Sequence, residues 1–351
     1  MVDEMQIAGR KIGPGHPPYI IAEMSGNHNG DIDRAFALIE AAKEAGADAV
    51  KLQTYTADTI TIKSDRPEFK IAGGLWDGYT LHDLYDEAHT PWDWHPRLFE
   101  KAKEVGITIF SSPFDFTAID FLESLDAPAY KIASFELVDL PLIIRAAATG
   151  KPLIMSTGIA NLDEIEDAIA AAKSANVSAL CVLHCISAYP APASQSHLQT
   201  IPDLAKRFDV LSGLSDHTMG TAVATTAIAM GACLIEKHFT LARADGGVDS
   251  DFSLEPHELK RLVDDCRTAW EAMGPAQYEL KGVEEANQQF RRSLYITAEM
   301  KAGDVLSADN LRSIRPGNGL PPRHYDELLG KAVSADIAAG TPLSWDLIKQ
   351  N

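Results

Sequence analysis

Short apolar segments alternate with amphipathic helical segments from residue 19 to residue 272, and this pattern constrains the fold more than any other feature of the chain. Each apolar segment leads through polar residues into a stretch such as DRAFALIEAAKEAGA, whose apolar residues recur at spacings of three and four. Strands that alternate with helices of this length form parallel βαβ units. The eight apolar segments are 19–25, 49–55, 108–113, 129–134, 152–157, 180–185, 209–216 and 233–239.

Eight such units predict a (β/α)8 barrel, the TIM-barrel class of α/β fold, over residues 1–275. An open doubly wound sheet is the alternative, but SGNHNG follows the first apolar segment in place of the Gly-rich phosphate loop of such sheets. The insertion at residues 56–94 is too long for a simple connection, and long loops often carry function.

The C-terminal part of the chain differs in kind. Residues 276–290 are expected to be a linker, and residues 291–351 contain an internal repeat in which ITAEMKAGDVLSADNL matches VSADIAAGTPLSWDLI at an offset of 37 residues. Two copies of a β-like run, an Ala-Gly turn and a Leu-Ser helix start predict a small, pseudo-symmetric, mostly β module.

Charge and composition narrow the classes of function. The formal net charge of −19 argues against a nucleic-acid surface, and an anionic substrate would need a local cluster of cations. No apolar run is long enough to span a membrane and no signal-peptide core is recognisable, so we expect a cytoplasmic protein without membrane association. The four cysteines are too few for a disulfide framework. Cys181 and Cys185 could form half of a zinc site, but we favour small residues buried on a core strand.

Polar residues gather where the predicted strands end, and catalytic side chains of such a barrel come from those ends. Alternation along a strand places Lys51 and Gln53 on one face, and it likewise pairs Ser215 with His217 and Glu236 with His238. The polar residues at these ends are Glu23, Lys51, Gln53, Ser111, Ser112, Lys131, Ser134, Glu136, Ser156, Ser215, His217, Glu236 and His238.

Two inward lysines are costly to bury without anions. If Glu23, Glu136 and Glu236 alone balance them, the cluster is structural. The serine hydroxyls at the same strand ends favour instead a bound phosphate or carboxylate group. The two histidines at neighbouring strand ends suit a borderline divalent metal ion with open coordination positions.

A family resemblance rests on motifs spread over nearly the whole chain, from about residue 10 to 349. The strings are EMSGNHNGD, GADAVKLQTYTADTIT, AHTPWDWH, FSSPFD, PAYKIASFE, STGIA, GLSDHTMG, IEKHFTL and RSIRPGNGL. They closely resemble the sialic acid synthase family, and within it the pseudaminic acid synthases. The resemblance implies a phosphoenolpyruvate-binding barrel followed by an antifreeze-like (SAF, β-clip) domain over 291–351. It also implies a homodimer in which this domain reaches the partner's barrel.

The resemblance further implies residue roles. The catalytic set is Glu23, Lys51, Gln53, His217 and His238. The two histidines hold a divalent metal ion, most often Mn²⁺, with Mg²⁺ or Co²⁺ as alternatives. Phosphoenolpyruvate binds Lys51, Ser112, Lys131, Ser134, Ser156 and Ser215, whereas the sugar binds Gln53, Glu136, Tyr189, Asp249 and the partner subunit's Arg315. Ser187 stands where N-acetylneuraminate synthases carry Asn, and this difference favours the pseudaminic branch.

The expected reaction condenses phosphoenolpyruvate with an amino-sugar aldehyde, a 2,4-diacetamido-2,4,6-trideoxyhexose, to give pseudaminic acid and phosphate. N-acetylneuraminate or legionaminate synthesis is the alternative within the family. A different class is a degenerate barrel that serves as a carbohydrate- or ice-binding module, but the lysines and histidines at the strand ends speak against it.

Overall fold

The computed structural model describes residues 4–350, and these fall into two compact units that divide between Gly274 and Pro275. No helix of the described part of the chain is long and apolar enough to cross a membrane.

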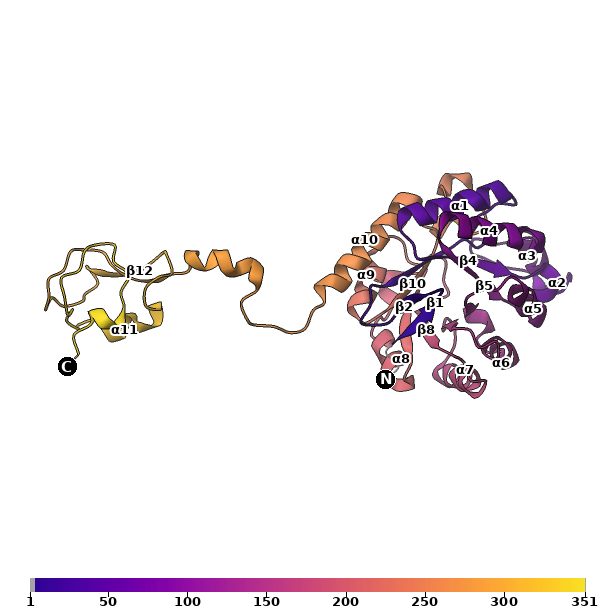
Figure 1. Ribbon diagram of the computed structural model, residues 1–351. Coiled ribbons are helices and arrows are strands. Elements are labelled where there is room, and N and C mark those ends of the chain that lie inside the picture. Colours follow the sequence, from indigo (N-terminus) through magenta and orange to yellow (C-terminus); the bar gives the residue numbers. More distant parts are fainter. Residues whose placement is uncertain (1–3, 351) are drawn as a thin grey trace. The chain divides into compact units, whose positions relative to one another are not determined.

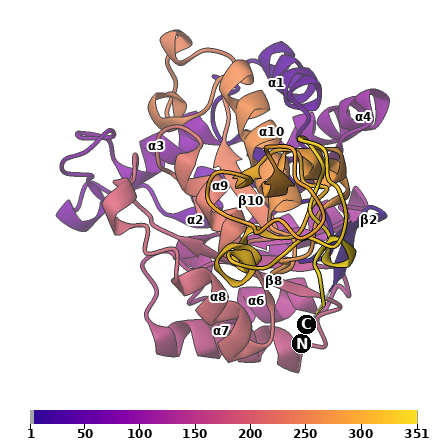
Figure 2. The same cartoon turned by 90° about the vertical axis from the view of Figure 1, so that its left-hand side faces the viewer.

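The first unit is a closed barrel of eight parallel strands surrounded by helices (Figures 1 and 2). The strands neighbour one another in chain order, and the last pairs with the first, for example His238 with Glu23. The TIM-barrel prediction is therefore confirmed, and every strand lies within its predicted apolar segment. The strands are β3 (Tyr19–Glu23), β4 (Ala49–Thr54), β5 (Thr108–Pro113), β6 (Tyr130–Ile132), β7 (Leu153–Ser156), β8 (Leu180–Cys185), β9 (Leu211–Asp216) and β10 (Leu234–His238).

The helices begin and end where local sequence signals require. Asp31 caps the first of them by accepting a hydrogen bond from the Asp33 amide, and Gly46 ends it in the left-handed conformation that glycine adopts without strain. Asn161 and Glu164 form a capping box at the start of another. The outer helices are α1 (Ile32–Ala45), α4 (His95–Val105), α5 (Phe116–Ser124), α6 (Leu140–Ala147), α7 (Leu162–Ser174), α8 (Thr200–Phe208), α9 (Ala222–Ala229) and α10 (Pro256–Ala272).

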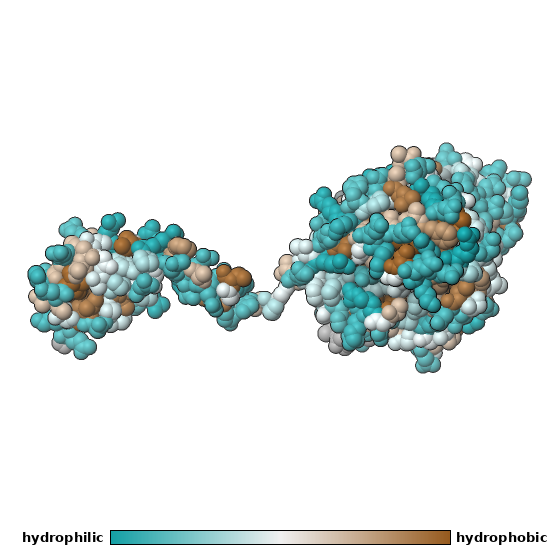
Figure 3. All heavy atoms as spheres, turned by 45° about the horizontal axis from the view of Figure 1, so that its top comes forward, coloured by the Kyte–Doolittle hydropathy of each residue, from teal (hydrophilic) through white to brown (hydrophobic). Residues whose placement is uncertain are grey.

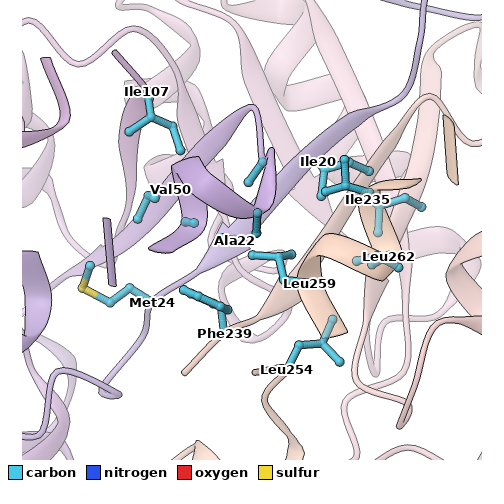
Figure 4. Packing of buried hydrophobic residues seen from close by; sticks show 14 of the residues in the cluster. Ile20, Ala22, Met24, Val50, Ile107, Ile235, Phe239, Leu254, Leu259 and Leu262 are labelled. Atoms are coloured by element: carbon cyan, nitrogen blue, oxygen red, sulfur yellow. The ribbon is translucent and has the colours of Figure 1, made fainter. Parts of the chain in front are cut away.

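Side-chain alternation divides the barrel into an outer and an inner core. Ile20 and Ala22 point outward near Leu259 and Leu262 of α10, while Val50 lies near Ile107 in the same cluster (Figure 4). The inward side chains of the first strand residues, such as Tyr19, Ala49 and Leu234, fill the N-terminal half of the barrel interior. The polar residues that follow them on the same faces therefore emerge at the C-terminal end.

A hairpin of β1 (Met5–Ile7) and β2 (Arg10–Ile12) precedes the barrel and was not expected from the sequence. Its buried residues Met5, Ile7 and Ile12 join the inner cluster at the N-terminal end of the barrel. Three-residue strands offer too short a pattern for periodicity to reveal. The hairpin covers the end of the barrel that lies opposite the polar residues.

The insertion after β4 contains α2 (Ala57–Ile60) and α3 (Leu81–Ala88), with a turn between them closed by hydrogen bonds from Ile71 N to Tyr79 O and from Gly78 N to Ile71 O. Single-turn 3-10 helices complete this unit, at Pro67–Phe69, Trp92–Trp94, Ser134–Glu136, Ala193–Gln195, Arg243–Asp245 and Ser250–Phe252.

The second unit confirms the internal repeat as a structural pseudo-two-fold. Met300 and Ile337, equivalent positions of the two copies, exchange hydrogen bonds of 2.9 and 2.8 Å. The bond from Gly303 N to Val333 O recurs 37 residues on as the bond from Gly340 N to Ile296 O, at 2.9 and 2.8 Å. The regular elements are a 3-10 helix at Gly282–Phe290, within the predicted linker, then β11 (Ser293–Ile296), β12 (Leu311–Ile314), 3-10 turns at Pro322–His324 and Trp345–Leu347, and α11 (Tyr325–Leu328).

Candidate active site

A cavity of about 470 Å³ opens at the C-terminal ends of the barrel strands. Every site residue predicted from the sequence lines it except Ser112 and Arg315. The predicted residues in its wall are Glu23, Lys51, Gln53, Lys131, Ser134, Glu136, Ser156, Tyr189, Ser215, His217, His238 and Asp249. Residues that are up to 226 positions apart in the chain thus share one chamber.

Two buried lysines and two buried glutamates form a charge network at the base of the cavity. Lys51 Nζ lies 2.7 Å from Glu23 Oε2 and 3.8 Å from Glu236 Oε2, and Lys131 Nζ lies 3.2 Å from Glu236 Oε1. Ser112 lies behind this network, where its Oγ is 3.1 Å from Lys51 Nζ. The lysines are therefore held by protein carboxylates while their ammonium groups still border the cavity.

The pKa values of the two glutamates of this network are shifted in opposite directions. Burial raises the pKa of Glu23 to about 7, against the opposing effect of the Lys51 ammonium group. Burial acts on Glu236 as well, but Lys131, Lys51 and the hydroxyl of Ser215 at 2.9 Å together lower its pKa to about 2. Near neutral pH Glu236 stays a carboxylate that anchors the lysines, whereas Glu23 can exchange a proton.

The serines near the lysines differ in whether their hydroxyl groups have a hydrogen-bond partner within the protein. Ser134 Oγ accepts a hydrogen bond of 3.1 Å from the amide of Gly158, while Ser156 Oγ is buried without any partner. A Cβ on Gly158 would lie 2.1 Å from Ser187 Oγ and 2.7 Å from Ser134 Oγ, so only glycine fits between them. Ser187 is outside the cavity wall, and a direct contact of its side chain with a ligand has no support in this geometry.

The two histidines face each other across the cavity wall, with ring centroids 5.3 Å apart. His217 Nδ1 lies 2.9 Å from the carbonyl oxygen of Ile186, which fixes the proton on Nδ1 and leaves Nε2 as an electron-pair donor. His238 Nδ1 is buried without a hydrogen-bond partner, and burial together with His217 keeps the pKa of His238 well below its usual range. Burial opposes the charged form of His217, but the contact with Cys185 and the Ile186 carbonyl outweigh it and raise the pKa of His217. The nitrogens left to ligate a metal ion are therefore Nε2 of His217, once unprotonated, and the unpartnered Nδ1 of His238.

A hydrogen-bonded chain runs along the cavity wall from Glu23, beside Lys51, to Asp249, whose Oδ2 lies 3.8 Å from His238 Nδ1. Gln53 Nε2 donates to Glu23 Oε1 at 2.8 Å and to Ser25 Oγ at 3.2 Å, and Ser25 Oγ in turn donates to Asp249 Oδ2. Glu136 stands apart from this chain. Its Oε2 is buried without a partner, and burial raises its pKa to about 7.

Aromatic side chains close the remaining wall. The ring of Tyr189 lies 4.5 Å from that of His217 and 5.6 Å from that of Trp76, and Trp76 Nε1 donates to Val248 O at 2.8 Å. Trp76 comes from the long insertion, which therefore contributes directly to the cavity. Trp92 and Trp94 of the same insertion do not line it, since Trp92 stacks on Phe121 and Trp94 packs against His28.

Comparison with known proteins identifies the family of this chain. A model of the NeuB family matches residues 38–278, and a model of the SAF domain matches residues 291–349. The first match covers more than half of the chain. The chain belongs to the NeuB family.

The most informative relatives of this NeuB-family chain are synthases. Pseudaminic acid synthase from Campylobacter jejuni (strain 81-176) is 45% identical over 325 residues, which are 93% of this chain and 95% of the relative. Pseudaminic acid synthase from Helicobacter pylori is 42% identical over 95% of this chain and 99% of its own. N,N'-diacetyllegionaminic acid synthase from Legionella pneumophila is 36% identical and covers 94% of each chain. The resemblance stated from the motifs is therefore confirmed.

Solved structures agree with this family assignment. N-acetylneuraminic acid synthetase from Leptospira borgpetersenii, in complex with citrate, superimposes with a TM-score of 0.73 at 30% identity and covers 81% of this chain and 95% of its own. A spore coat polysaccharide biosynthesis protein from Bacillus subtilis, SpsE, gives 0.67 at 33% identity over 99% of both chains.

Arg315 lies in the second unit, in the exposed loop after β12. Cys181 and Cys185 are free and buried, as favoured from the sequence. Glu236 and Ser25 were not assigned to the site from the sequence. Glu236 shares a strand face with His238, and that signal could have identified it. Ser25 carries a comparable signal, because alternation along the segment 19–25 places it on the same face as Glu23.

Proposed function

We propose that this NeuB-family chain condenses phosphoenolpyruvate with a 2,4-diacetamido-2,4,6-trideoxyhexose and water to form pseudaminic acid and phosphate, in the cytoplasm. The observation that carries the proposal is the joint placement of two buried lysines and a pair of histidines in one chamber of the barrel. The pseudaminic acid synthases at 42–45% identity support the choice of product. Legionaminate and N-acetylneuraminate synthesis are the alternatives that other relatives suggest.

The lysine end of the cavity suits phosphoenolpyruvate. The net charge of the chain is −19, which repels anions at long range. Lys51 and Lys131 supply the local positive charge that attracts an anion to this end of the cavity. The unpartnered hydroxyl of Ser156, with Ser134 and Ser215 beside it, offers donors to phosphate or carboxylate oxygens. Ser112 supports this end indirectly through Lys51.

The histidine pair fits a divalent metal ion, with Mn²⁺ as the favoured ion and Mg²⁺ or Co²⁺ as alternatives. His217 has its Nδ1 engaged by the Ile186 carbonyl, and His238 carries an unsatisfied buried nitrogen. No group of three or more potential ligands of the types His, Cys, Asp and Glu gathers among residues 4–350, so the remaining positions would be open to substrate and water. Such an ion, when bound, would polarise the aldehyde oxygen of the open-chain sugar.

The chain's own residues then account for the chemical steps. Lys51 and Lys131 hold phosphoenolpyruvate so that its C3 attacks the aldehyde carbon, which forms the new C–C bond and leaves positive charge at C2. Water adds to C2, and phosphate departs with cleavage of the C–O bond of the resulting adduct. Glu23, whose pKa of about 7 matches the task, takes the proton of the attacking water.

The wall beside the histidine pair, where Asp249 and Tyr189 lie, suits the amino sugar. Gln53, Glu136 and Asp249 offer polar atoms to its acetamido and hydroxyl groups, and Tyr189 with Trp76 presents an apolar wall to its C6 methyl group. One methyl group contributes only about 1–3 kcal/mol to discrimination, so the second acetamido group must contribute as well.

The assembly that we propose is a homodimer in which the SAF domain of one chain serves the barrel of the other and brings Arg315 to the sugar. Arg315 is exposed on a loop, as a residue that acts on a partner would be. Large apolar side chains are also exposed just beyond the strand ends of the barrel, although most of the visible surface is hydrophilic (Figure 3). Those side chains are Phe116, Phe135, Val138, Ile159, Leu162 and Met219.

The test is product analysis by mass spectrometry. The purified protein, treated with chelator and then resupplied with Mn²⁺, is incubated with phosphoenolpyruvate and a panel of 2-acetamido and 2,4-diacetamido hexoses. We expect fastest turnover of the 2,4-diacetamido-2,4,6-trideoxyhexose, with phosphate released and no activity before Mn²⁺ is restored. Faster turnover of N-acetylmannosamine would refute the pseudaminic assignment, and full activity of the chelated protein would refute the metal.

A further inference from the structure

Ser25 occupies a strained position beside the catalytic residues. It follows β3 by two residues, its side chain is buried in the cavity wall, and its backbone φ of 47° lies in the left-handed region. Glycine adopts this region freely, whereas a residue with a Cβ pays a steric cost. Such strained residues persist where the surrounding structure requires the side chain.

The hydroxyl of Ser25 forms hydrogen bonds with both Gln53 and Asp249, two residues that we propose bind the sugar. It donates to Asp249 Oδ2, since a carboxylate only accepts, and its lone pair accepts from Gln53 Nε2 at 3.2 Å. The second hydrogen of Gln53 Nε2 goes to Glu23 Oε1 at 2.8 Å. Both amide hydrogens of Gln53 are therefore engaged within the protein, and its Oε1 is the atom left for a ligand.

We propose that Ser25 is a positioning residue that fixes the hydrogen-bond direction of the sugar subsite. With its hydroxyl in place, Gln53 presents a carbonyl oxygen and Asp249 is held at the cavity wall, so the subsite offers acceptors to N–H and O–H donors of the sugar. The inference rests on the proposed function and adds to it the residue that orients the subsite and the polarity of the groups recognised there.

The Ser25→Gly variant tests the contribution of the hydroxyl alone, because glycine keeps the backbone conformation and relieves its strain. We expect the KM for the amino sugar to rise about tenfold, as the loss of one oriented hydrogen bond predicts. The KM for phosphoenolpyruvate should stay within twofold, and the melting temperature should change little because relieved strain offsets the lost hydrogen bond.

The matched control is Ser111→Ala. Ser111 is also fully buried and its Oγ lies 2.6 Å from Thr54 Oγ1, but it does not line the cavity. This control should lower the melting temperature and leave the sugar KM unchanged. The inference is wrong if Ser25→Gly keeps the wild-type sugar KM, or if both KM values rise together with a fall in melting temperature.

Crystal structures of the wild type and of Ser25→Gly give a readout that needs no turnover. We expect the Gln53 amide to rotate or become disordered and the Asp249 carboxylate to shift in the variant. Unchanged positions of both side chains would overturn the inference. If the wild type turned over no amino sugar at all, the proposed function would fail, and this structural comparison would still decide the role of Ser25.

Discussion

Burial and charge act on single residues in ways that a list of polar positions does not reveal. Glu23, Glu136 and Glu236 are carboxylates of the same cavity, yet burial takes the pKa of the first two to about 7 and the lysines take that of the third to about 2. Their surroundings alone therefore suit one residue type to the three roles that we propose, namely proton transfer, substrate recognition and charge balance.

Glu136 gives a prediction about pH. Its carboxylate form accepts hydrogen bonds from sugar donors, and this form becomes dominant as pH rises through the pKa of about 7. We expect the KM for the sugar to fall several-fold between pH 6 and pH 8, as measured by steady-state kinetics. Glu136→Gln should remove this trend in the KM and leave the KM for phosphoenolpyruvate unchanged. A trend that persists in the variant would assign the titration to another group.

The same shift has a consequence for stability. The pKa of Glu136 is higher in the folded protein than its ordinary value of 4.5, so the folded state binds the proton more tightly than the unfolded state. The stabilising contribution of the protonated form is present below about pH 4.5 and is lost as pH rises through 7. Glu136→Gln should accordingly gain stability relative to the wild type over that window.

At the scale of elements, the strands β9 and β10 are joined by a buried ion pair outside the barrel interior. Lys237 Nζ lies 2.6 Å from Asp216 Oδ2, with side-chain exposures of 0% and 1%. Lys237 also donates to the Thr218 carbonyl, and Asp216 Oδ1 accepts from the Thr218 amide at 2.9 Å. The turn that carries His217 is thereby fixed to the strand that carries His238.

Breaking this pair should be costly. Lys237→Met leaves the Asp216 carboxylate buried without its partner, and we expect the free energy of unfolding to fall by about 3–5 kcal/mol in urea titrations. The double variant Asp216→Leu with Lys237→Met should recover part of the loss. Lys260→Met is the matched control, because Lys260 and its partner Asp264, which lie 2.8 Å apart, are both exposed. The expected loss of unfolding free energy in this control is below about 1 kcal/mol. Equal losses in the two single variants would contradict this view.

At the scale of the whole molecule, the chain combines an enzyme barrel with a module that holds the remaining predicted site residue, Arg315. The module has its own core, formed by residues such as Leu294, Leu306 and Leu343, and its two repeat copies exchange backbone hydrogen bonds. An arginine suits the proposed role because its planar fork holds two acceptors at once.

Complementation between inactive chains tests the shared site. Arg315→Ala and His217→Ala chains should each lose most turnover, and a mixture that has exchanged subunits should regain part of it, because a mixed dimer keeps one site with both groups. Heterodimer formation is checked by native mass spectrometry with two mass-tagged chains. Confirmed heterodimers without activity above either parent would show that Arg315 does not act across the interface.

The local features of this protein can be read from its sequence. The eight strands, the faces shared by Lys51 with Gln53 and by Glu236 with His238, and the repeat of the C-terminal module follow from periodicity, which is a property of neighbouring residues. Motif resemblance also identified the family, which the comparisons confirm.

Contacts between distant side chains depend on how the whole chain folds. Ser25 and Asp249 are 224 positions apart, and Trp76 reaches Val248 across 172 positions. Whether Lys131 faces a carboxylate or an open cavity depended on the closure of the barrel, which brings Glu236 within 3.2 Å. Periodicity fixes the direction in which a side chain leaves its strand, but the contacts, the burial and hence the pKa values arise only when distant strands pack together.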